Sequence, residues 1–67
     1  MTAKEMFEEL GFELRMERND HLYYYSDYCI VNIYPLAKTF GVHTNMVIES
    51  DLILALYQQS KELGWVK

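Results

Sequence analysis

Hydrophobic and polar residues alternate through the middle of the chain, and a period of two is the signature of half-buried β-strands. The densest stretch is residues 22–34, L-Y-Y-Y-S-D-Y-C-I-V-N-I-Y, which holds five of the six tyrosines. Aromatic and β-branched side chains suit a pleated sheet, whereas Ser26 and Asp27 suit a tight turn. We therefore predict a β-hairpin over residues 22–34, ended by Pro35 because proline has no backbone N–H to donate.

Two further strands flank this hairpin. Residues 12–18 alternate between apolar and charged side chains, and the turn pair Asn19-Asp20 separates them from the hairpin. The fourth strand is predicted over residues 39–44, where Gly41 marks a bulge or an edge. The apolar positions that we expect in the core are Phe12, Leu14 and Met16 in the first strand and Phe40 and Val42 in the last. Residues 45–49 are expected to lead into the last element in an extended conformation.

Apolar residues follow helical spacing only at the two ends of the chain. The first predicted helix covers residues 3–10, with Thr2 and Glu5 at capping-box spacing and Gly11 at its end. The second covers residues 51–63, with Ser50 as its N-cap. Its apolar stripe is Leu52, Ala55, Leu56, Gln59 and Leu63, widened by Ile53 and Tyr57, while Leu54 lies nearly opposite.

The two helices end with the same short motif. Residues 9–12 read E-L-G-F and residues 62–65 read E-L-G-W. Glycine enters the left-handed conformation that closes a helix without steric cost, and the aromatic residue after it can fold back on the last turn. We interpret the repetition as the same capping chemistry used twice, not as a duplicated domain.

The order α-β-β-β-β-α with short connections predicts an α+β fold. Neighbouring strands should pair as a four-stranded antiparallel meander, and both terminal helices should pack on one face of it. Residues 1–67 form a single domain of marginal stability, since a chain this short buries only about 60% of its unfolded surface. A domain this small usually needs a disulfide, a metal or a partner chain for its stability. Its lone cysteine cannot form an internal disulfide, so we expect a homodimer.

The second strand of the hairpin has two unequal faces because side chains alternate along a strand. Cys29, Val31 and Ile33 form a small aliphatic face that suits the core. The opposite face carries Tyr28, Ile30, Asn32 and Tyr34, and it is either half-solvated or pressed against another chain. Together with Leu54 on the second helix, its hydrophobic members define a candidate interface of Tyr28, Ile30, Tyr34 and Leu54.

Catalytic and metal-binding constellations are not apparent. Cys29 has no neighbouring histidine and is expected to be a buried structural residue. His21 and His43 could meet across the sheet as metal ligands, but they lack the spacing of a zinc motif, so turn and surface positions explain them better. The acidic pair Glu8-Glu9 is explained by a solvated helix face. The pair Glu49/Asp51 is explained by the preference of acidic side chains for a helix N-terminus. We therefore expect no catalytic residues, no metal, no cofactor and no enzymatic activity.

The net charge of −4 makes nucleic acid an unlikely partner, since phosphate binding needs clustered lysines and arginines. The tyrosines could still act as stacking platforms for single-stranded nucleic acid, although such platforms usually line a positive groove. Glu5, Glu8 and Glu9 occupy the place where an export signal needs an apolar segment. With one unpaired cysteine and no run long enough to span a membrane, we expect a cytoplasmic protein.

Both ends of the chain resemble a known class of sequences. The motifs are A-K-E-M-F-E-E-L-G-F at residues 3–12, K-T-F at 38–40 and S-K-E-L-G-W at 60–65. They are similar to those of short uncharacterised proteins encoded by prophages and mobile elements of Gram-positive bacteria. This resemblance implies a small cytoplasmic accessory protein of unknown activity and brings no catalytic residues with it.

Two functional hypotheses follow. The first is a non-enzymatic protein–protein interaction module that acts as a homodimer and binds or modulates another protein. The second is a nucleic-acid-binding accessory protein that uses its surface tyrosines. The first rests on the face that carries Ile30 and Tyr34, together with a core too small to be very stable alone.

Overall fold

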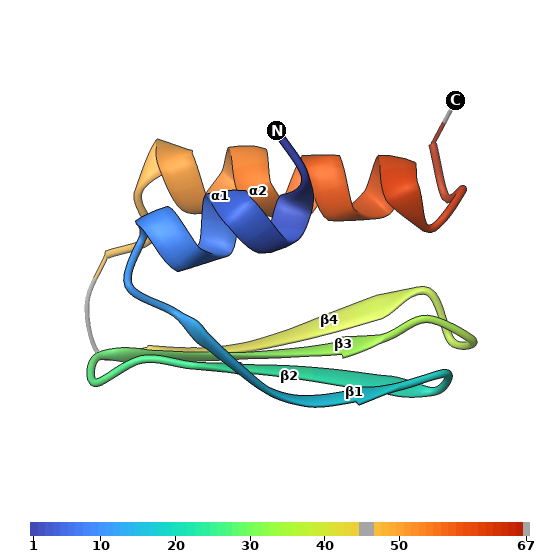
Figure 1. The fold of residues 1–67 in the computed structure, drawn as a ribbon, viewed down its shortest axis with the longest axis horizontal. Helices are drawn as coiled ribbons and strands as arrows, with labels where there is room; N and C mark the ends of the chain where they lie inside the picture. Colours follow the sequence, from blue (N-terminus) through green and yellow to red (C-terminus); the bar gives the residue numbers. More distant parts are fainter. Residues whose placement is uncertain (45–46, 67) are drawn as a thin grey trace.

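The computed structural model describes residues 1–44 and 47–66. Its elements are α1 (Ala3–Glu9), β1 (Glu13–Arg18), β2 (His21–Tyr25), β3 (Cys29–Tyr34), β4 (Thr39–Thr44) and α2 (Ser50–Glu62). The four strands pair antiparallel in the order β1-β2-β3-β4, and both helices lie on one side of the sheet (Figure 1). The predicted α+β meander with two terminal helices is thus confirmed. Asn45 and Met46, part of the predicted lead-in to the second helix, lie outside the described residues.

The N-terminus of α1 is held by the predicted capping box. The Glu5 N–H donates to the Thr2 hydroxyl at 3.2 Å, and the Glu5 carboxylate accepts from the Thr2 N–H at 2.8 Å. The Thr2 N–H and, at 3.1 Å, the Thr2 hydroxyl both donate to this carboxylate, and they lower the pKa of the Glu5 carboxyl because they favour its charged form. In α2, by contrast, the predicted N-cap is wrong. Ser50 is already the first helical residue, and Glu49 takes the cap position without a side-chain hydrogen bond.

Both helices end in the same backbone motif, as the repeated sequence predicts. Gly11 and Gly64 adopt positive φ angles of 93° and 78°. The N–H of Phe12 donates to the carbonyl of Phe7 at 3.0 Å, and Trp65 makes the matching bond to the carbonyl five residues before it at 2.9 Å. This is the Schellman arrangement, which satisfies carbonyls that a helix end would otherwise leave unpaired.

Replacing Gly11 with alanine is expected to destabilise the protein by about 1–2 kcal/mol, because an L-residue is strained at positive φ. Space is not the obstacle, since an added Cβ would meet no atom within 4 Å. Gly41→Ala is the matched control, because Gly41 lies in a strand without positive φ and its Cβ would sit 3.9 Å from the Asn32 Cβ. Urea unfolding of the two variants checks this. An equal loss at both positions would contradict the strain argument.

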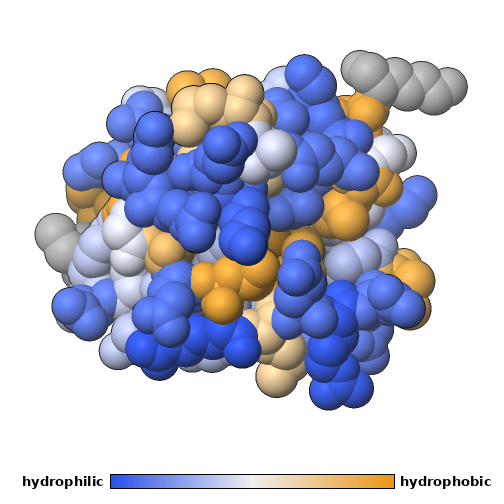
Figure 2. Space-filling view, viewed as in Figure 1, coloured by the Kyte–Doolittle hydropathy of each residue, from blue (hydrophilic) through white to orange (hydrophobic). Residues whose placement is uncertain are grey.

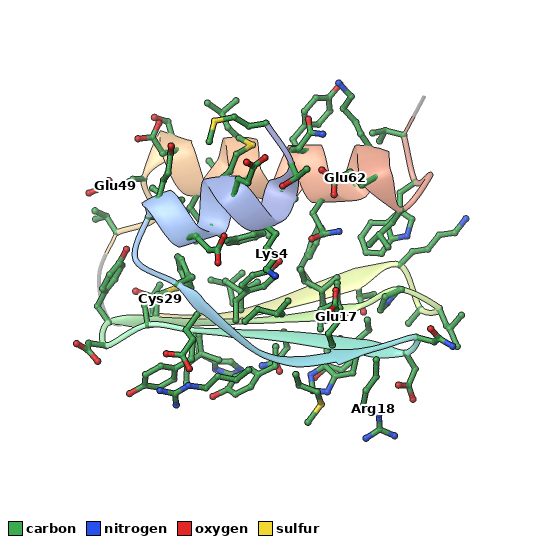
Figure 3. All side chains as sticks on the ribbon, in the orientation of Figure 1. Lys4, Glu17, Arg18, Cys29, Glu49 and Glu62 are labelled. Carbon is green, nitrogen blue, oxygen red and sulfur yellow. The ribbon has the colours of Figure 1, made fainter. Side chains whose placement is uncertain are left out.

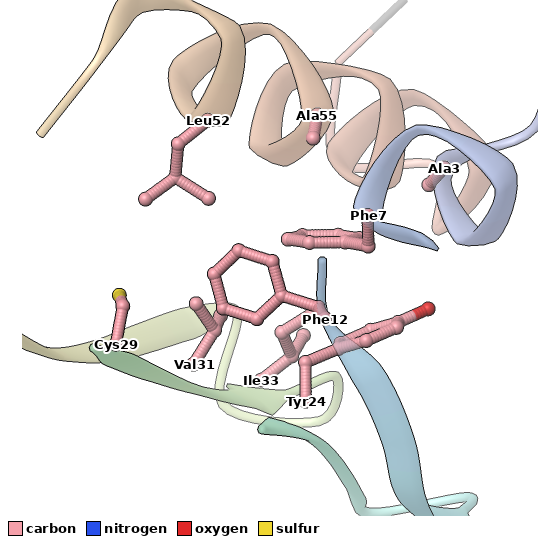
Figure 4. Packing of buried hydrophobic residues seen from close by; sticks show 9 residues of the cluster. All are labelled: Ala3, Phe7, Phe12, Tyr24, Cys29, Val31, Ile33, Leu52 and Ala55. Atoms are coloured by element: carbon pink, nitrogen blue, oxygen red, sulfur yellow. The ribbon is translucent and has the colours of Figure 1, made fainter. Parts of the chain in front are cut away.

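The core lies between the sheet and the two helices (Figure 4). The ring of Phe7 stacks on the ring of Tyr24, with centroids 4.1 Å apart, and meets Phe12 edge-on at 5.6 Å. Burial of these three rings joins α1 to β1 and β2. Nearly complete burial also extends to Ala3, Cys29, Val31, Ile33, Leu52 and Ala55. The predicted assignment of Cys29, Val31 and Ile33 to the core face of β3 is confirmed.

The prediction that Met16 lies in the core is wrong. Leu14 pairs with Tyr24, but the next pair joins Met16 to Tyr23, so Arg15 is an extra residue that forms a β-bulge. Tyr23 and Tyr24 point to opposite faces of β2, and Tyr24 is the buried one. The bulge therefore turns Met16 away from the helices, and it does not pack against the core cluster as Leu14 does.

A hydrogen bond ties the start of α1 to the end of α2. The Glu62 carboxylate accepts from the Ala3 N–H at 2.6 Å and from the Gln58 side-chain amide at 3.0 Å. The N-terminus of a helix carries unpaired N–H groups and a partial positive charge, so a carboxylate is favourable there. Figure 3 shows Glu62 within the helix layer, on the side where the chain begins.

Candidate interaction surfaces

The face of the sheet that points away from the helices is uncovered, and we call it the open face. Its side chains include Met16 of β1, Tyr23 and Tyr25 of β2, and Ile30, Asn32 and Tyr34 of β3. β3 is an interior strand, so Ile30 lies between Tyr25 and His43 near one end of this face, and Asn32 lies in the next row beside Tyr23. Most of these side chains are half-buried by one another, and Tyr34 is 38% exposed.

Side chains on the open face hold one another in place. The Arg15 guanidinium lies over the Tyr25 ring, 3.7 Å from its centroid. The His21 ring stacks on Tyr34 with centroids 4.9 Å apart and planes 8° from parallel, and its Nε2 lies 2.7 Å from the Asn32 Oδ1. Contacts of this kind reduce the side-chain entropy that is lost when a surface binds a partner.

Charge is divided unequally between the two layers of the fold. On the sheet side, Arg15 lies 3.3 Å from the Glu13 carboxylate and Arg18 lies 3.7 Å from Asp20, so the open face is close to neutral. The helices and their immediate flanks carry six carboxylates against two lysines, which leaves four negative charges. These residues are Glu5, Glu8, Glu9, Glu49, Asp51 and Glu62 against Lys4 and Lys61. Hydrophilic side chains cover most of the face seen in Figure 2.

The four predicted interface residues do not share one surface. Ile30 and Tyr34 lie on the open face, but Tyr28 does not. Its hydroxyl donates to the Leu10 carbonyl at 3.0 Å and its ring lies 6.1 Å from Phe12, so it reaches past the end of the sheet to the helix side. Placing Tyr28 with Ile30 was wrong because β3 begins only at Cys29, and strand alternation does not extend into the turn.

The fourth predicted interface residue, Leu54, lies on α2, on the other side of the molecule from the open face. It is 54% exposed, as its position opposite the apolar stripe predicts. Ile53 and Tyr57 were predicted to widen the buried stripe, but they are 57% and 52% exposed. The helix pair covers only one face of the sheet, and α1 packs against only one flank of α2, so the other flank stays exposed (Figure 1).

The two histidines are not brought together. His43 is paired with Ile30, whereas His21 stacks on Tyr34, four residues further along β3. Four residues of a strand span about 13 Å, which is too far for a shared metal ion. Within residues 1–44 and 47–66, no group of three potential ligands from His, Cys, Asp and Glu is close enough to hold a metal.

Cys29 lies in the core, where burial raises the pKa of its thiol and a hydrogen bond with Thr44 partly opposes this shift. The thiolate, which is the reactive form, is therefore disfavoured at neutral pH. This position agrees with the expectation of a structural cysteine.

Sequence reasoning missed an apolar pocket at one end of the molecule. Its volume is about 300 Å³, and it opens between the sheet and the helix layer where the chain enters α2. Its walls include Leu10, Phe12, Tyr28, Cys29, Ile48 and Leu52. The signal that could have revealed it is hydrophobic residues in connecting segments, namely Tyr28 in a turn and Val47 and Ile48 before the helix.

Comparison of the chain with protein-family models, with curated proteins and with solved structures finds no match. Neither helix in the part of the chain that the structure describes is long and apolar enough to cross a membrane.

Proposed function

We propose that this protein is a small cytoplasmic, non-enzymatic interaction module that acts as a homodimer joined through the open face. The observation that carries the proposal is an uncovered, nearly neutral sheet face on which Ile30 lies beside Tyr25, with Tyr23 and Tyr34 further along the strands. Buried Cys29 is compatible with a reducing compartment, since no disulfide is formed. An accessory role of this kind also agrees with the resemblance noted from the sequence motifs.

The composition of the open face favours a protein partner. Tyrosine, arginine and methionine are enriched at protein interfaces, and binding energy is concentrated in central anchors surrounded by residues that exclude water. Ile30 is the aliphatic side chain that β3 contributes to this face, and it is flanked by Tyr25 and His43. The tyrosines can pack their rings while their hydroxyls stay hydrated at the rim.

The distribution of charge favours a second copy of this chain on the open face over the same copy on the helices. Two helix layers, each with four excess negative charges, would repel one another. Two open faces meet without that penalty because each arginine there has a carboxylate beside it. Sheets packed face to face lie about 10 Å apart, so the acidic helix layers would then be on the outside of the dimer.

The accessible surface of the chain determines how much of the open face a dimer interface must include. A stable interface buries about 800 Å² of each partner, which is roughly a sixth of the 4634 Å² accessible surface of this chain. The periphery of the face, including Tyr34 and Met16, is therefore expected to contribute as well as Ile30.

Replacing both Ile30 and Tyr34 with lysine is expected to convert a dimer into a monomer. Two buried positive charges per subunit would be left without partners in the interface. Neither side chain belongs to the core cluster, so far-ultraviolet circular dichroism should be unchanged. Molar mass from light scattering over a range of concentrations is the measurement.

The matched control replaces Ile53 and Leu54 with lysine, which puts the same charges on exposed apolar positions of α2. This variant should keep the mass of the wild type. A wild-type chain that stays monomeric at high concentration, or a double Ile30/Tyr34 variant with unchanged mass, would overturn the proposal.

One observation supports the alternative of a nucleic-acid-binding accessory protein. Arg15, Arg18, His21 and His43, which are all the arginines and histidines of the chain, lie on or beside the open face with its tyrosines. Single-stranded nucleic acid would stack on the rings and place phosphates near the cations. The carboxylates beside both arginines weaken this reading. Absence of tyrosine quenching by oligonucleotides at low salt would exclude it, whereas quenching that salt reverses would favour it over the dimer.

A further inference from the structure

The apolar pocket is built from several parts of the fold that meet at one end of the molecule. Leu10 and Phe12 come from the segment that follows α1, Leu52 from the first turn of α2, and Cys29 from the start of β3. Figure 4 shows Leu52 pointing down from the helix and Cys29 pointing up from the sheet at this end. Tyr28 adds a further wall, and the hydrogen bond from its hydroxyl to the Leu10 carbonyl holds it there.

Hydrophobic side chains at the mouth of the pocket remain in contact with water. Ile48 is 48% exposed, Tyr28 is 46% exposed and Val47 is 85% exposed, although all three line the pocket. Exposed apolar residues around a concave apolar site are characteristic of a surface that binds a partner side chain. None of the three belongs to the open face, so dimerisation there leaves the pocket accessible.

The surroundings of the pocket are acidic. Glu49 lines the pocket itself, and Figure 3 shows it in the helix layer at the same end of the molecule as Cys29. A neighbouring groove shares Leu10 with the pocket and is lined by Glu9 and Asp51. No lysine or arginine among the described residues lines either hollow. An occupant must therefore combine an apolar group with positive charge.

We propose that this pocket binds a basic peptide segment of a partner protein. One large apolar side chain of the segment inserts between Leu52 and Cys29, and flanking lysines or arginines face Glu49, Glu9 and Asp51. A second copy of this chain is a poor occupant because its own helix layer carries the same excess of negative charge. This proposal does not depend on the homodimer: the two surfaces are separate, and each is tested without the other.

Fluorescence anisotropy with a labelled peptide tests the proposal on the whole chain. The probe has one phenylalanine between two pairs of lysines. One comparison peptide carries glutamates in place of the lysines, and another carries glycine in place of the phenylalanine. We expect both changes to weaken binding by at least about tenfold, because charge and apolar insertion each contribute. Equal binding of the basic and acidic peptides, or of the phenylalanine and glycine peptides, would overturn the proposal, as would no binding of the probe.

Variants of the protein locate the site. Glu49→Lys reverses the charge at the pocket and removes no hydrogen bond from the N-terminus of α2, since the Glu49 side chain makes no cap bond. It should weaken probe binding by about tenfold or more. Glu8→Lys is the matched reversal on α1, where Glu8 lines neither hollow, and it should change binding by less than about threefold, as expected of a screened surface charge. Equal losses of probe binding in the two variants would indicate a general attraction to an acidic surface and would overturn the proposed site.

The Ile30→Lys/Tyr34→Lys variant separates this proposal from the homodimer. It should bind the probe as the wild type does, because both substitutions lie on the open face. Probe binding that disappears together with the dimer would place the peptide on the open face and overturn the pocket. If the wild type proved to be monomeric but still bound the probe, the homodimer would be overturned and the peptide site would stand.

Discussion

Replacing Phe7 with alanine is expected to remove a large part of the free energy of unfolding of this chain. The Phe7 ring is completely buried, stacked on Tyr24 at 4.1 Å and in edge contact with Phe12 at 5.6 Å. Truncating a buried phenylalanine to alanine costs about 3–5 kcal/mol, because apolar contacts are lost and a cavity remains. A domain of 67 residues has a total stability of only about 3–10 kcal/mol. Far-ultraviolet circular dichroism during urea unfolding measures the effect.

Tyr57→Ala is the matched control for this truncation. Tyr57 is also an aromatic residue of a helix, but it is 52% exposed, so its loss should change the free energy of unfolding by no more than about 0.5 kcal/mol. Similar losses for the two variants would contradict the central position of Phe7 between α1 and the sheet.

Stability is also expected to fall steeply between about pH 10 and pH 12. Burial of the Tyr24 side chain, followed by the nearby carboxylates Glu17, Glu62 and Glu8, raises the pKa of its phenol from 10.0 to about 12. In this window the folded chain keeps the proton and the unfolded chain releases it, so rising pH favours unfolding. The stability contributed by the neutral phenol is fully present below pH 10, and about 2–3 kcal/mol is lost by pH 12.

Tyr24→Phe tests the origin of this alkaline loss. Phenylalanine keeps a ring against Phe7 and removes the titrating proton, so its free energy of unfolding should fall less between pH 10 and pH 12 than that of the wild type. Tyr57→Phe serves as the control because the Tyr57 side chain is 52% exposed and lies outside the core. Urea unfolding at several pH values gives the three profiles. Parallel profiles for the wild type and Tyr24→Phe would show that other groups cause the loss.

The two proposed surfaces follow from one property of the fold. A two-layer arrangement buries one face of the sheet and leaves the other uncovered, so the amphipathic side chains of β2 and β3 form the open face. The helices meet water on their outer side, and most of the acidic residues of the chain lie there. A dimer through the open face would therefore display two acidic, pocket-bearing layers outward.

Features that depend on neighbouring residues could be predicted from the sequence. The capping box at Thr2 requires only a hydroxyl and a carboxylate three residues apart. The two helix ends require glycine at positive φ, which Gly11 and Gly64 supply. The antiparallel meander follows from short connections, which leave consecutive strands no other partners. In each case the deciding interactions lie within a few residues along the chain.

Features that depend on strand register and on the packing of distant segments could not be predicted from the sequence. Alternation assigns side chains to a face only while every residue advances the strand equally, and the extra residue at Arg15 reversed the assignment of Met16. Tyr28 turned to the helix side because the Leu10 carbonyl, eighteen residues earlier in the chain, accepts its hydroxyl. Of the four predicted interface residues, only Ile30 and Tyr34 share the open face. The pocket, likewise, exists only where the ends of both helices meet the sheet, because contacts between distant segments are set by the packing of the whole chain.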